Sequence, residues 1–180
     1  MNASEYHIPE LISEESIQER IAELAHALNT HYHGMQPIIL CNLIGAFRFY
    51  SDLIREMTIP LQTEFISFTR YFDDIPDKTL TQMKPARLNL HNRHCILIDD
   101  IWDHGTTLNA LMHDIQALQP ASLYTAVLLN KSNDQKIQLP IDWVGFSVPN
   151  VFVIGYGLDY KENYRYLNYI GILSDSANKT

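Results

Sequence analysis

Side chains that could do chemistry are concentrated in one short stretch of this 180-residue chain. The apolar run Ile96-Leu97-Ile98 is followed, at positions 99–107, by three aspartates, a histidine, a glycine and two threonines. Gly105 permits backbone conformations in which successive amides turn toward one point, and Thr106 and Thr107 add hydroxyl donors. A helix that begins there directs its N-terminal dipole and free N–H groups to the same point. The pattern therefore predicts a phosphate-binding loop.

Three acids beside a phosphate site make sense if they face something other than the phosphate. Sugar hydroxyls donate hydrogen bonds to carboxylates, Mg²⁺ prefers oxygen ligands, and a further acid can carry a proton. The alternative is structural: Asp103 caps the helix while Asp99 and Asp100 are solvated in a loop. For a single aspartate that alternative is favoured. Three acids together with His-Gly-Thr-Thr at the end of a strand favour a functional site.

Alternating strands and helices must position this loop. Short apolar runs predict strands and a 3.6-residue period predicts helices. The expected strands cover residues 37–43, 63–69, 95–99, 122–130 and 151–155, and the expected helices cover residues 46–57, residues 106–118 and a segment that begins at Ser13. This order predicts an α/β fold with a parallel, doubly wound sheet, whose ligands bind beyond the carboxyl ends of the strands. The acid-rich stretch lies at one such end.

Two segments are harder to assign. Residues 70–92 are polar and lack a clear period, so we expect a long mobile loop. Residues 142–173 are rich in aromatic side chains and contain only the strand expected at 151–155. The helix that follows Ser13 is clearer, because a serine before two glutamates is typical of an N-cap. Its apolar positions fall on one face: Ile17, Ile21, Leu24, Ala25 and Leu28.

The composition narrows the class of protein. The chain is long enough for one domain with a core, and 46% hydrophobic and 19% charged residues are typical of a globular protein. A net charge of -8 argues against binding of nucleic acid, which needs a basic face.

Cys41 and Cys95 lie in apolar runs, as expected for buried thiols in a reducing compartment. There is no signal-peptide pattern and no apolar run of about 18 residues, so we expect a cytoplasmic protein that does not span a membrane.

Two histidine pairs invite a metal-site interpretation. They are His31 with His33, near an expected helix end, and His91 with His94, in a loop that runs into a strand. Neither pair is joined by a matching second pair of ligands, so structural or solvated histidines are favoured over zinc. The chain contains no H-E-x-x-H, G-x-S-x-G or P-loop pattern.

Residues 96–107 resemble the phosphoribosyl-pyrophosphate (PRPP) motif of the type I phosphoribosyltransferases: an apolar strand, two acids, two apolar residues, Asp, a variable residue, Gly and Thr. Three further stretches are similar to the hypoxanthine-guanine phosphoribosyltransferases: LIGAFRFYSDLIREM, EFISFTRY and DWVGFSVPNVFVIGYGLDYKENYRYLNYIGIL. The resemblance covers about residues 38 to 173. It implies one type I phosphoribosyltransferase domain over 1–180, with a core at about 10–140 and a small C-terminal hood formed by about 142–173 with the N-terminus.

The resemblance also implies a reaction. These enzymes join hypoxanthine or guanine to PRPP with Mg²⁺, giving IMP or GMP and pyrophosphate in purine salvage. By resemblance Asp99 and Asp100 hold the ribose hydroxyls and a metal, and Asp103 is the general acid/base at purine N7. The loop His104, Gly105, Thr106 and Thr107 would bind the 5′-phosphate.

Other positions match site residues of the family by resemblance alone. Their implied roles are as follows: Ile44, Gly45 and Arg165 at the pyrophosphate; Lys131 at the purine 6-oxo group; Phe152 stacked on the base; the backbone of Val153 at its edge; Asp159 near the base and a second Mg²⁺; Arg70 and Tyr71 in the catalytic flap. Each has a simpler structural interpretation. Lys131 could be solvated at a strand end, Phe152 could belong to the core, and Arg165 could stack on surface tyrosines.

Four positions depart from the family pattern. His104 stands where Thr or Ser is usual, Ile44 where a basic residue is usual, Arg70 where Ser is usual, and Asp99 where Glu is common. Ile44 and His104 keep one alternative open, a non-catalytic paralogue that binds nucleotide or PRPP. A second alternative is a regulator on the same fold that binds nucleic acid and senses PRPP or nucleotide, although the net charge of -8 and the presence of Asp103 argue against it. A xanthine-preferring relative is a closer alternative. The resemblance further implies a homodimer or homotetramer, and PRPP and a 6-oxopurine as the partners.

Overall fold

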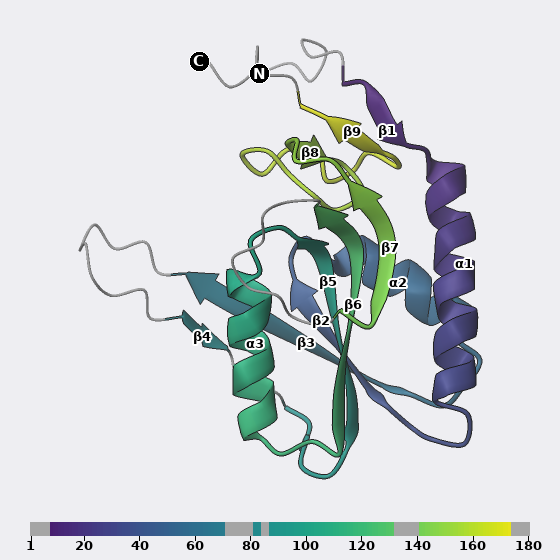
Figure 1. Cartoon of the computed structure of the whole chain (residues 1–180), viewed down its shortest axis with the longest axis vertical. Helices are drawn as coiled ribbons and strands as arrows, with labels where there is room; N and C mark the ends of the chain where they lie inside the picture. Colours follow the sequence, from purple (N-terminus) through teal and green to yellow (C-terminus); the bar gives the residue numbers. More distant parts are fainter. Residues whose placement is uncertain (1–7, 71–80, 84–86, 132–140, 174–180) are drawn as a thin grey trace.

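The computed structural model describes residues 8–70, 81–83, 87–131 and 141–173, and its centre is a six-stranded sheet (Figure 1). The strand order is β4-β3-β2-β5-β6-β7. Their bounds are β2 Ile38–Leu43, β3 Gln62–Arg70, β4 Thr81–Met83, β5 His94–Trp102, β6 Ser122–Lys131 and β7 Trp143–Val148. All neighbouring pairs run parallel except β3 and β4, which are antiparallel. The predicted α/β class with a parallel sheet is confirmed.

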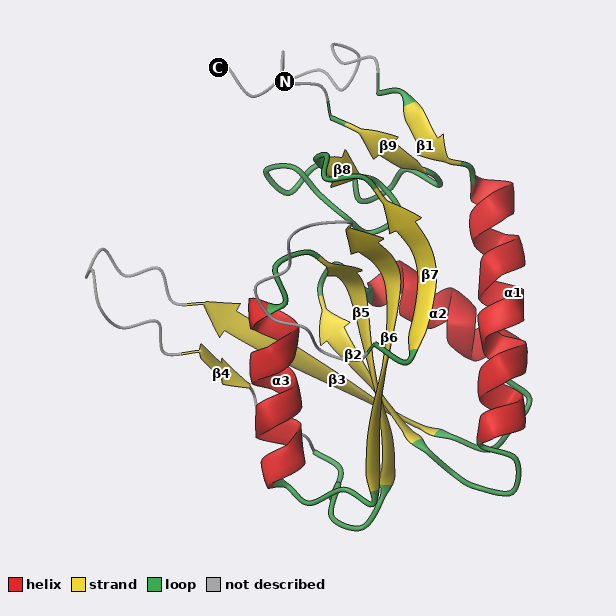
Figure 2. Ribbon diagram, in the orientation of Figure 1, coloured by secondary structure: helices red, strands yellow, loops and turns green. Residues whose placement is uncertain are grey.

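Helices cover both faces of this sheet (Figure 2). They are α1 (Glu14–His31), α2 (Phe47–Glu56) and α3 (Thr106–Ala117). Ile39 and Cys41 of β2 pack in one core with α1 and α2, whereas Ile38 and Leu40 pack in a second core with α3. Successive side chains of a strand point to opposite faces, so a strand covered on both sides must be apolar throughout. Each buried Ile or Leu contributes about 1.5–3 kcal/mol.

Helix α1 begins as the sequence predicts. The hydroxyl oxygen of Ser13 accepts a hydrogen bond from the backbone N–H of Ser16 at 3.2 Å, and Ser13 itself is extended (φ −71°, ψ 159°). Glu14 and Glu15 occupy the first turn, where the helix dipole favours negative charge. The five apolar positions assigned to its inner face are all buried. The N-cap and the periodic pattern therefore predicted this helix correctly.

A second, three-stranded sheet lies beyond the carboxyl ends of β5, β6 and β7 (Figure 1). Its strands are β1 (Glu10–Ile12), β8 (Val153–Ile154) and β9 (Ile170–Ile172), in the order β1-β9-β8 with antiparallel pairing. We call this sheet, with the connecting residues 155–169, the hood. The hood lies over the sheet edge at which parallel α/β sheets bind their ligands.

Three predictions about elements are wrong in part. The long loop expected at 70–92 contains β4, in which Thr81 pairs with Arg70 of β3. Residues 142–173 contain β7 and β9 as well as the expected strand, which shrinks to the two residues of β8. Strand β5 continues to Trp102 because Ile101 and Trp102 still pair with β6. Asp100 therefore lies within the strand and not after it, while Asp99 lies inside the strand as expected.

Two predictions about the environment can be compared with the structure. Among the residues that the structure describes, no helix is both long and apolar enough to cross a membrane. Cys41 and Cys95 are buried and carry free thiols. Burial raises the pKa of the Cys41 thiol to about 12 and that of the Cys95 thiol to about 11, so both are neutral and act as small apolar core groups.

Glu64 holds the chain where it returns to the sheet after β4. Its carboxylate is almost fully buried and accepts hydrogen bonds from the backbone N–H groups of Phe65, Arg87 and Leu88, at 2.9 to 3.1 Å. Burial alone would raise the pKa of this carboxyl, but the three backbone donors and the Arg87 guanidinium outweigh it, so the pKa is lowered. Glu64 therefore stabilises the fold as an anion.

Replacing Glu64 by glutamine should lower the free energy of unfolding by about 1–3 kcal/mol near neutral pH, because buried N–H donors lose a charged acceptor. A group with a lowered pKa stabilises the fold above its unfolded pKa and loses that effect as pH falls through the folded pKa. Urea denaturation should therefore show the difference between the two proteins shrinking below the usual glutamate range. Glu19→Gln, on the exposed face of α1, is the control. Equal stability of Glu64→Gln and the unaltered protein at neutral pH would contradict the assignment.

Candidate active site

The acid-rich stretch lines a cavity of about 290 Å³ where β5 ends and α3 begins. Asn42 of β2 and residues 99–108 form its walls. Gly105 precedes the first turn of α3 with φ +77°, a left-handed conformation that favours glycine. Having no side chain, Gly105 cannot cap the helix, so the first-turn amides remain available to an anion. The structure thus brings Asp99, Asp100, Asp103 and the loop 104–107 into one site.

Asp99 and Asp100 form an electrostatically strained pair. Asp99 is 5% exposed, and its Oδ1 accepts hydrogen bonds from Asn42 Nδ2 and from the backbone N–H of Asp100, both at 3.0 Å. Burial, and then the charge of Asp100, raise the pKa of Asp99 well above its usual range. Burial also raises the pKa of Asp100, although the Ile101 N–H donates to it at 2.9 Å. The pair therefore favours a bound cation or hydroxyl donors, which relieve the repulsion.

Replacing Asp99 by asparagine should stabilise the ligand-free protein. An acid whose folded pKa is raised destabilises the fold progressively as pH rises from the unfolded pKa through the folded one. The variant should therefore match the unaltered protein at pH values below the usual aspartate range and be more stable than it at higher pH. Thermal unfolding without Mg²⁺ over that pH range measures the difference. A variant that is less stable near pH 8 would show that the pair is not strained.

Asn42 is a site residue that the sequence reasoning missed. It is 9% exposed and donates to Asp99, and its own Oδ1 has no hydrogen-bond partner in the part of the chain that the structure describes. The signal was available, because a polar residue interrupts the apolar run IILCNLI close to the carboxyl end of a strand. Buried amides are normally satisfied. This oxygen therefore points to a donor that arrives with a ligand.

Asp103 lies between two basic side chains. Its Oδ2 pairs with Lys131 Nζ at 2.8 Å, and its Oδ1 lies 3.2 Å from His104 Nδ1. Lys131 ends β6 and is only 8% exposed, so the interpretation of a solvated lysine is wrong. His104 is 77% exposed. The Asp103 carboxylate, which lines the cavity, is therefore paired with a buried side-chain amine.

Gly45 and Gly157 bring the loop after β2 against the hood. A Cβ at Gly45 would lie 1.7 Å from Oδ2 of Asp100, and a Cβ at Gly157 would lie 2.3 Å from the carbonyl oxygen of Gly45. Ile44, beside them, is 57% exposed. Only glycines permit this approach, so the loop 44–45 sits between the acid pair and the hood.

Arg165 is held inside the hood. It donates to the carbonyl oxygen of Gly157 at 2.8 Å and pairs with Asp159 at 2.8 Å and with Glu162 at 3.1 Å. Its positive charge also counteracts the raised pKa of Asp100. The guanidinium is thus oriented by carboxylates and a carbonyl group on the hood side of the site.

This geometry can be compared with known proteins. Residues 10–161 match the phosphoribosyl transferase domain family. The chain belongs to the phosphoribosyltransferase family. It is 37% identical over 168 residues to the hypoxanthine-guanine-xanthine phosphoribosyltransferase of Tritrichomonas foetus, covering 93% of this chain and 92% of that one. The hypoxanthine-guanine phosphoribosyltransferase of Bacillus subtilis is 36% identical, with 93% of each chain covered. A crystal structure of a hypoxanthine phosphoribosyltransferase from Staphylococcus aureus matches with a TM-score of 0.88 and 33% identity, over 95% of this chain and 94% of that one.

The remaining predicted positions of this phosphoribosyltransferase lie in the hood and at the end of β3. Phe152 is 47% exposed and contacts the ring of Tyr160 edge-on, so the interpretation of a core phenylalanine is wrong. Val153 is buried in β8. Arg70 ends β3, and Tyr71 lies outside the described residues. The exposed ring of Phe152 is available to stack on a ligand.

The carboxylates of the phosphoribosyltransferase site fit Mg²⁺ in part. Asp99 and Asp100 are oxygen donors in one cavity, and a cation would relieve their mutual repulsion. Asp159 is engaged elsewhere, by Arg165 and by the backbone N–H of Glu162. Within the described part of the chain, no three His, Cys, Asp or Glu side chains are arranged to hold a metal. Because Mg²⁺ often binds through one or two carboxylates plus substrate phosphates, the site suits a cation that arrives with its substrate.

Proposed function

We propose that this phosphoribosyltransferase salvages hypoxanthine, guanine or both, converting them with PRPP to IMP or GMP and pyrophosphate. One observation carries the proposal: a carboxylate, Asp103, shares a cavity with the loop 104–107 and pairs with the buried ammonium of Lys131. That arrangement offers a proton acceptor, a cation for a carbonyl oxygen and amides for a phosphate. The names and the high coverage of the similar purine phosphoribosyltransferases support the same conclusion.

In the proposed reaction, purine N9 bonds to the ribose C1′, the C1′–O bond to pyrophosphate breaks, and the N7 proton moves to Asp103. Lys131 would turn from Asp103 to donate to the 6-oxo group, while Phe152 stacks on the base and the backbone of Val153 meets its edge. Asp99 and Asp100 would hold the ribose hydroxyls, and Gly45 and Arg165 the pyrophosphate, beside Ile44. Mg²⁺, held by Asp99 and Asp100 and with Asp159 near, would neutralise charge on the leaving group.

The test is steady-state turnover with PRPP and Mg²⁺ against hypoxanthine, guanine, xanthine and adenine. Turnover of one or both of the first two and none of adenine is expected, because Lys131 is a donor and suits an oxo group at position 6. Xanthine is included because one similar protein is named for it. No turnover of any base, with PRPP still raising the melting temperature, would favour a non-catalytic nucleotide-binding protein. The exposed Ile44 in the pyrophosphate loop favours that second candidate.

His104 belongs to the proposed 5′-phosphate loop, and its imidazole would donate to the phosphate. Replacing it by alanine, which has no side-chain donor, should weaken PRPP binding several-fold, because a hydrogen bond to a charged acceptor is lost. Calorimetry of the unaltered protein and of His104→Ala measures the difference. Equal PRPP affinity of the two proteins would remove His104 from phosphate binding.

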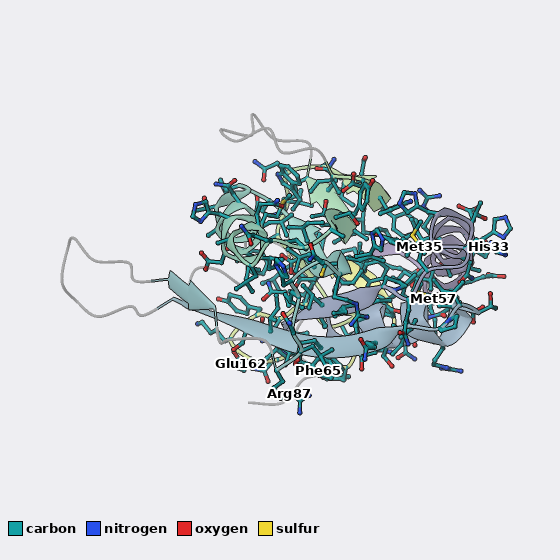
Figure 3. The ribbon with its side chains drawn as sticks, turned by 90° about the horizontal axis from the view of Figure 1, so that it is seen from below. His33, Met35, Met57, Phe65, Arg87 and Glu162 are labelled. Atoms are coloured by element: carbon teal, nitrogen blue, oxygen red, sulfur yellow. The ribbon has the colours of Figure 1, made fainter. Side chains whose placement is uncertain are left out.

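The proposal includes a cytoplasmic location and a homodimer or homotetramer. Two buried free thiols support the first. Exposed apolar side chains near α2 and β3 support the second: Phe65, 48% exposed, contacts the ring of Tyr50 at 5.2 Å, and Phe47 is 38% exposed. Figure 3 labels Phe65 and Arg87 along the same side of the molecule. A partly apolar surface of this kind suits a second copy, and sedimentation equilibrium measures the number of copies.

A further inference from the structure

Arg48, in the first turn of α2, is bound to the hood by three hydrogen bonds. Its Nη1 donates to the carbonyl oxygen of Leu167 at 2.7 Å and to that of Tyr166 at 3.1 Å, and its Nη2 donates to Asn168 Oδ1 at 2.9 Å. Its guanidinium also lies 4.8 Å from the centre of the Tyr156 ring. One side chain therefore joins the helix after the pyrophosphate loop to two parts of the hood.

Tyr156 makes a second connection between the same elements. Its ring is buried, 1% exposed, and its hydroxyl donates to Oδ2 of Asp52, which lies one turn after Arg48. Gln18 of α1 donates to the same oxygen at 3.1 Å. Burial, together with the bond to Asp52, raises the pKa of Tyr156 far above its usual range, so the phenol stays protonated and remains a donor.

These contacts lead directly to Arg165, to which the proposed function assigns pyrophosphate. Leu167 accepts from Arg48 and also from the backbone N–H of Tyr156, and the N–H of Gly157 donates to the carbonyl oxygen of Arg165 at 3.0 Å. Gly157 in turn packs against Gly45. Moving Leu167 therefore moves Gly157 and Arg165 relative to the loop 44–45. Neither Arg48 nor Asp52 lines the cavity.

We infer that Arg48 is a positioning residue for PRPP binding: it sets Arg165 and Gly157 of the hood against the pyrophosphate loop 44–45. The inference rests on the proposed function, because that function assigns pyrophosphate to Arg165 and Gly45. The loop and Arg48 are joined through the first turn of one helix, so they move together. The side chain of Ile44 has no charge that could bind pyrophosphate. The affinity for PRPP therefore depends more on the position of Arg165.

The test compares Arg48→Met with Arg20→Met. Arg20 is a matched control because it too is half-buried and ties a helix to two backbone carbonyl oxygens, those of Val144 at 2.8 Å and Gly145 at 2.9 Å. Neither of these two hydrogen bonds reaches the hood or the loop 44–45. Calorimetry with PRPP and Mg²⁺, the melting temperature and steady-state constants are measured for both variants and for Arg48→Lys.

Arg48→Met should weaken PRPP binding about tenfold, as expected when charge-assisted hydrogen bonds that orient a site are lost. Its KM for PRPP should rise more than its kcat falls. Arg20→Met should stay within about twofold in affinity even if both variants lose stability equally. Arg48→Lys keeps a cation near Tyr156 and one donor, so it should recover part of the affinity.

Equal PRPP affinity in Arg48→Met and Arg20→Met would overturn the inference. So would a loss in Arg48→Met that Arg48→Lys does not reduce. The proposed function is tested independently of this inference, and it is refuted if the unaltered protein turns over no purine. In that case the PRPP affinities of the variants still decide the role of Arg48, and an unaltered protein that binds no PRPP would refute both.

Discussion

Replacing Asp103 by asparagine should reduce kcat by about 10²–10⁴-fold, the usual contribution of a positioned acid or base. The amide keeps the shape of the carboxylate and an oxygen that can still accept from Lys131, so the fold and PRPP binding should persist. It cannot take a proton from purine N7. Single-turnover measurement with hypoxanthine isolates this step from product release.

The control for Asp103→Asn is Asp114→Asn, which changes a partly exposed aspartate of α3 that pairs with His113. It should keep full activity. A loss below about tenfold in Asp103→Asn would mean that another group or water takes the proton. Loss of PRPP binding in the same variant would instead make Asp103 a structural partner of Lys131 and His104. The two results are distinguished by calorimetry on the purified variant.

Replacing Gly157 by alanine should strongly weaken PRPP binding and destabilise the protein. Gly157 has φ +101°, and a Cβ there would lie 2.3 Å from the carbonyl oxygen of Gly45. Backbone strain at such a position costs about 1–3 kcal/mol. The clash is with backbone, so relief requires the loop 44–45 or the hood to move. Either movement separates the loop 44–45, the proposed pyrophosphate loop, from Arg165, so the KM for PRPP should rise by at least about 10²-fold, as for a displaced positioning group.

The variant Gly34→Ala tests the effect of backbone strain without a steric clash. Gly34 also has a positive φ, +77°, but a Cβ at this position would have no described atom within 4 Å. The variant should lose about 1 kcal/mol of stability with an unchanged KM. Thermal unfolding and PRPP titration of both variants give the comparison. If Gly157→Ala kept its PRPP affinity, the loop and the hood would not need their close contact.

Sequence reasoning worked best where one local signal decides the structure. Ser13 with its two glutamates predicted the start of α1, and the apolar run at 37–43 predicted the strand β2, which is buried on both faces. The motif at 99–107 predicted a single site, because those residues are neighbours in the chain and turn at Gly105. In each case the determining contacts lie within a few residues.

Sequence reasoning failed where the contacts that define an element come from residues far away in the chain. Strand β7 is an edge strand of mixed burial, and only its pairing with β6 defines it. Strand β4 is three residues long and depends on β3. Arg48 resembles an ordinary helix residue in the sequence, because the carbonyl groups it contacts lie about 120 positions away. The salt bridge between Lys131 and Asp103 likewise joins residues that a local pattern cannot connect.

The pairing of β1 with β9 limits the order in which strands can pair while the chain is synthesised. β1 ends at Ile12, but its partner begins at Ile170, so β1 stays unpaired until β9 has left the ribosome. The strands β2, β3, β5 and β6 pair over much shorter separations and can associate earlier, since closing a short loop loses less chain entropy. We therefore expect the loop 104–107 to form before the hood can close over it.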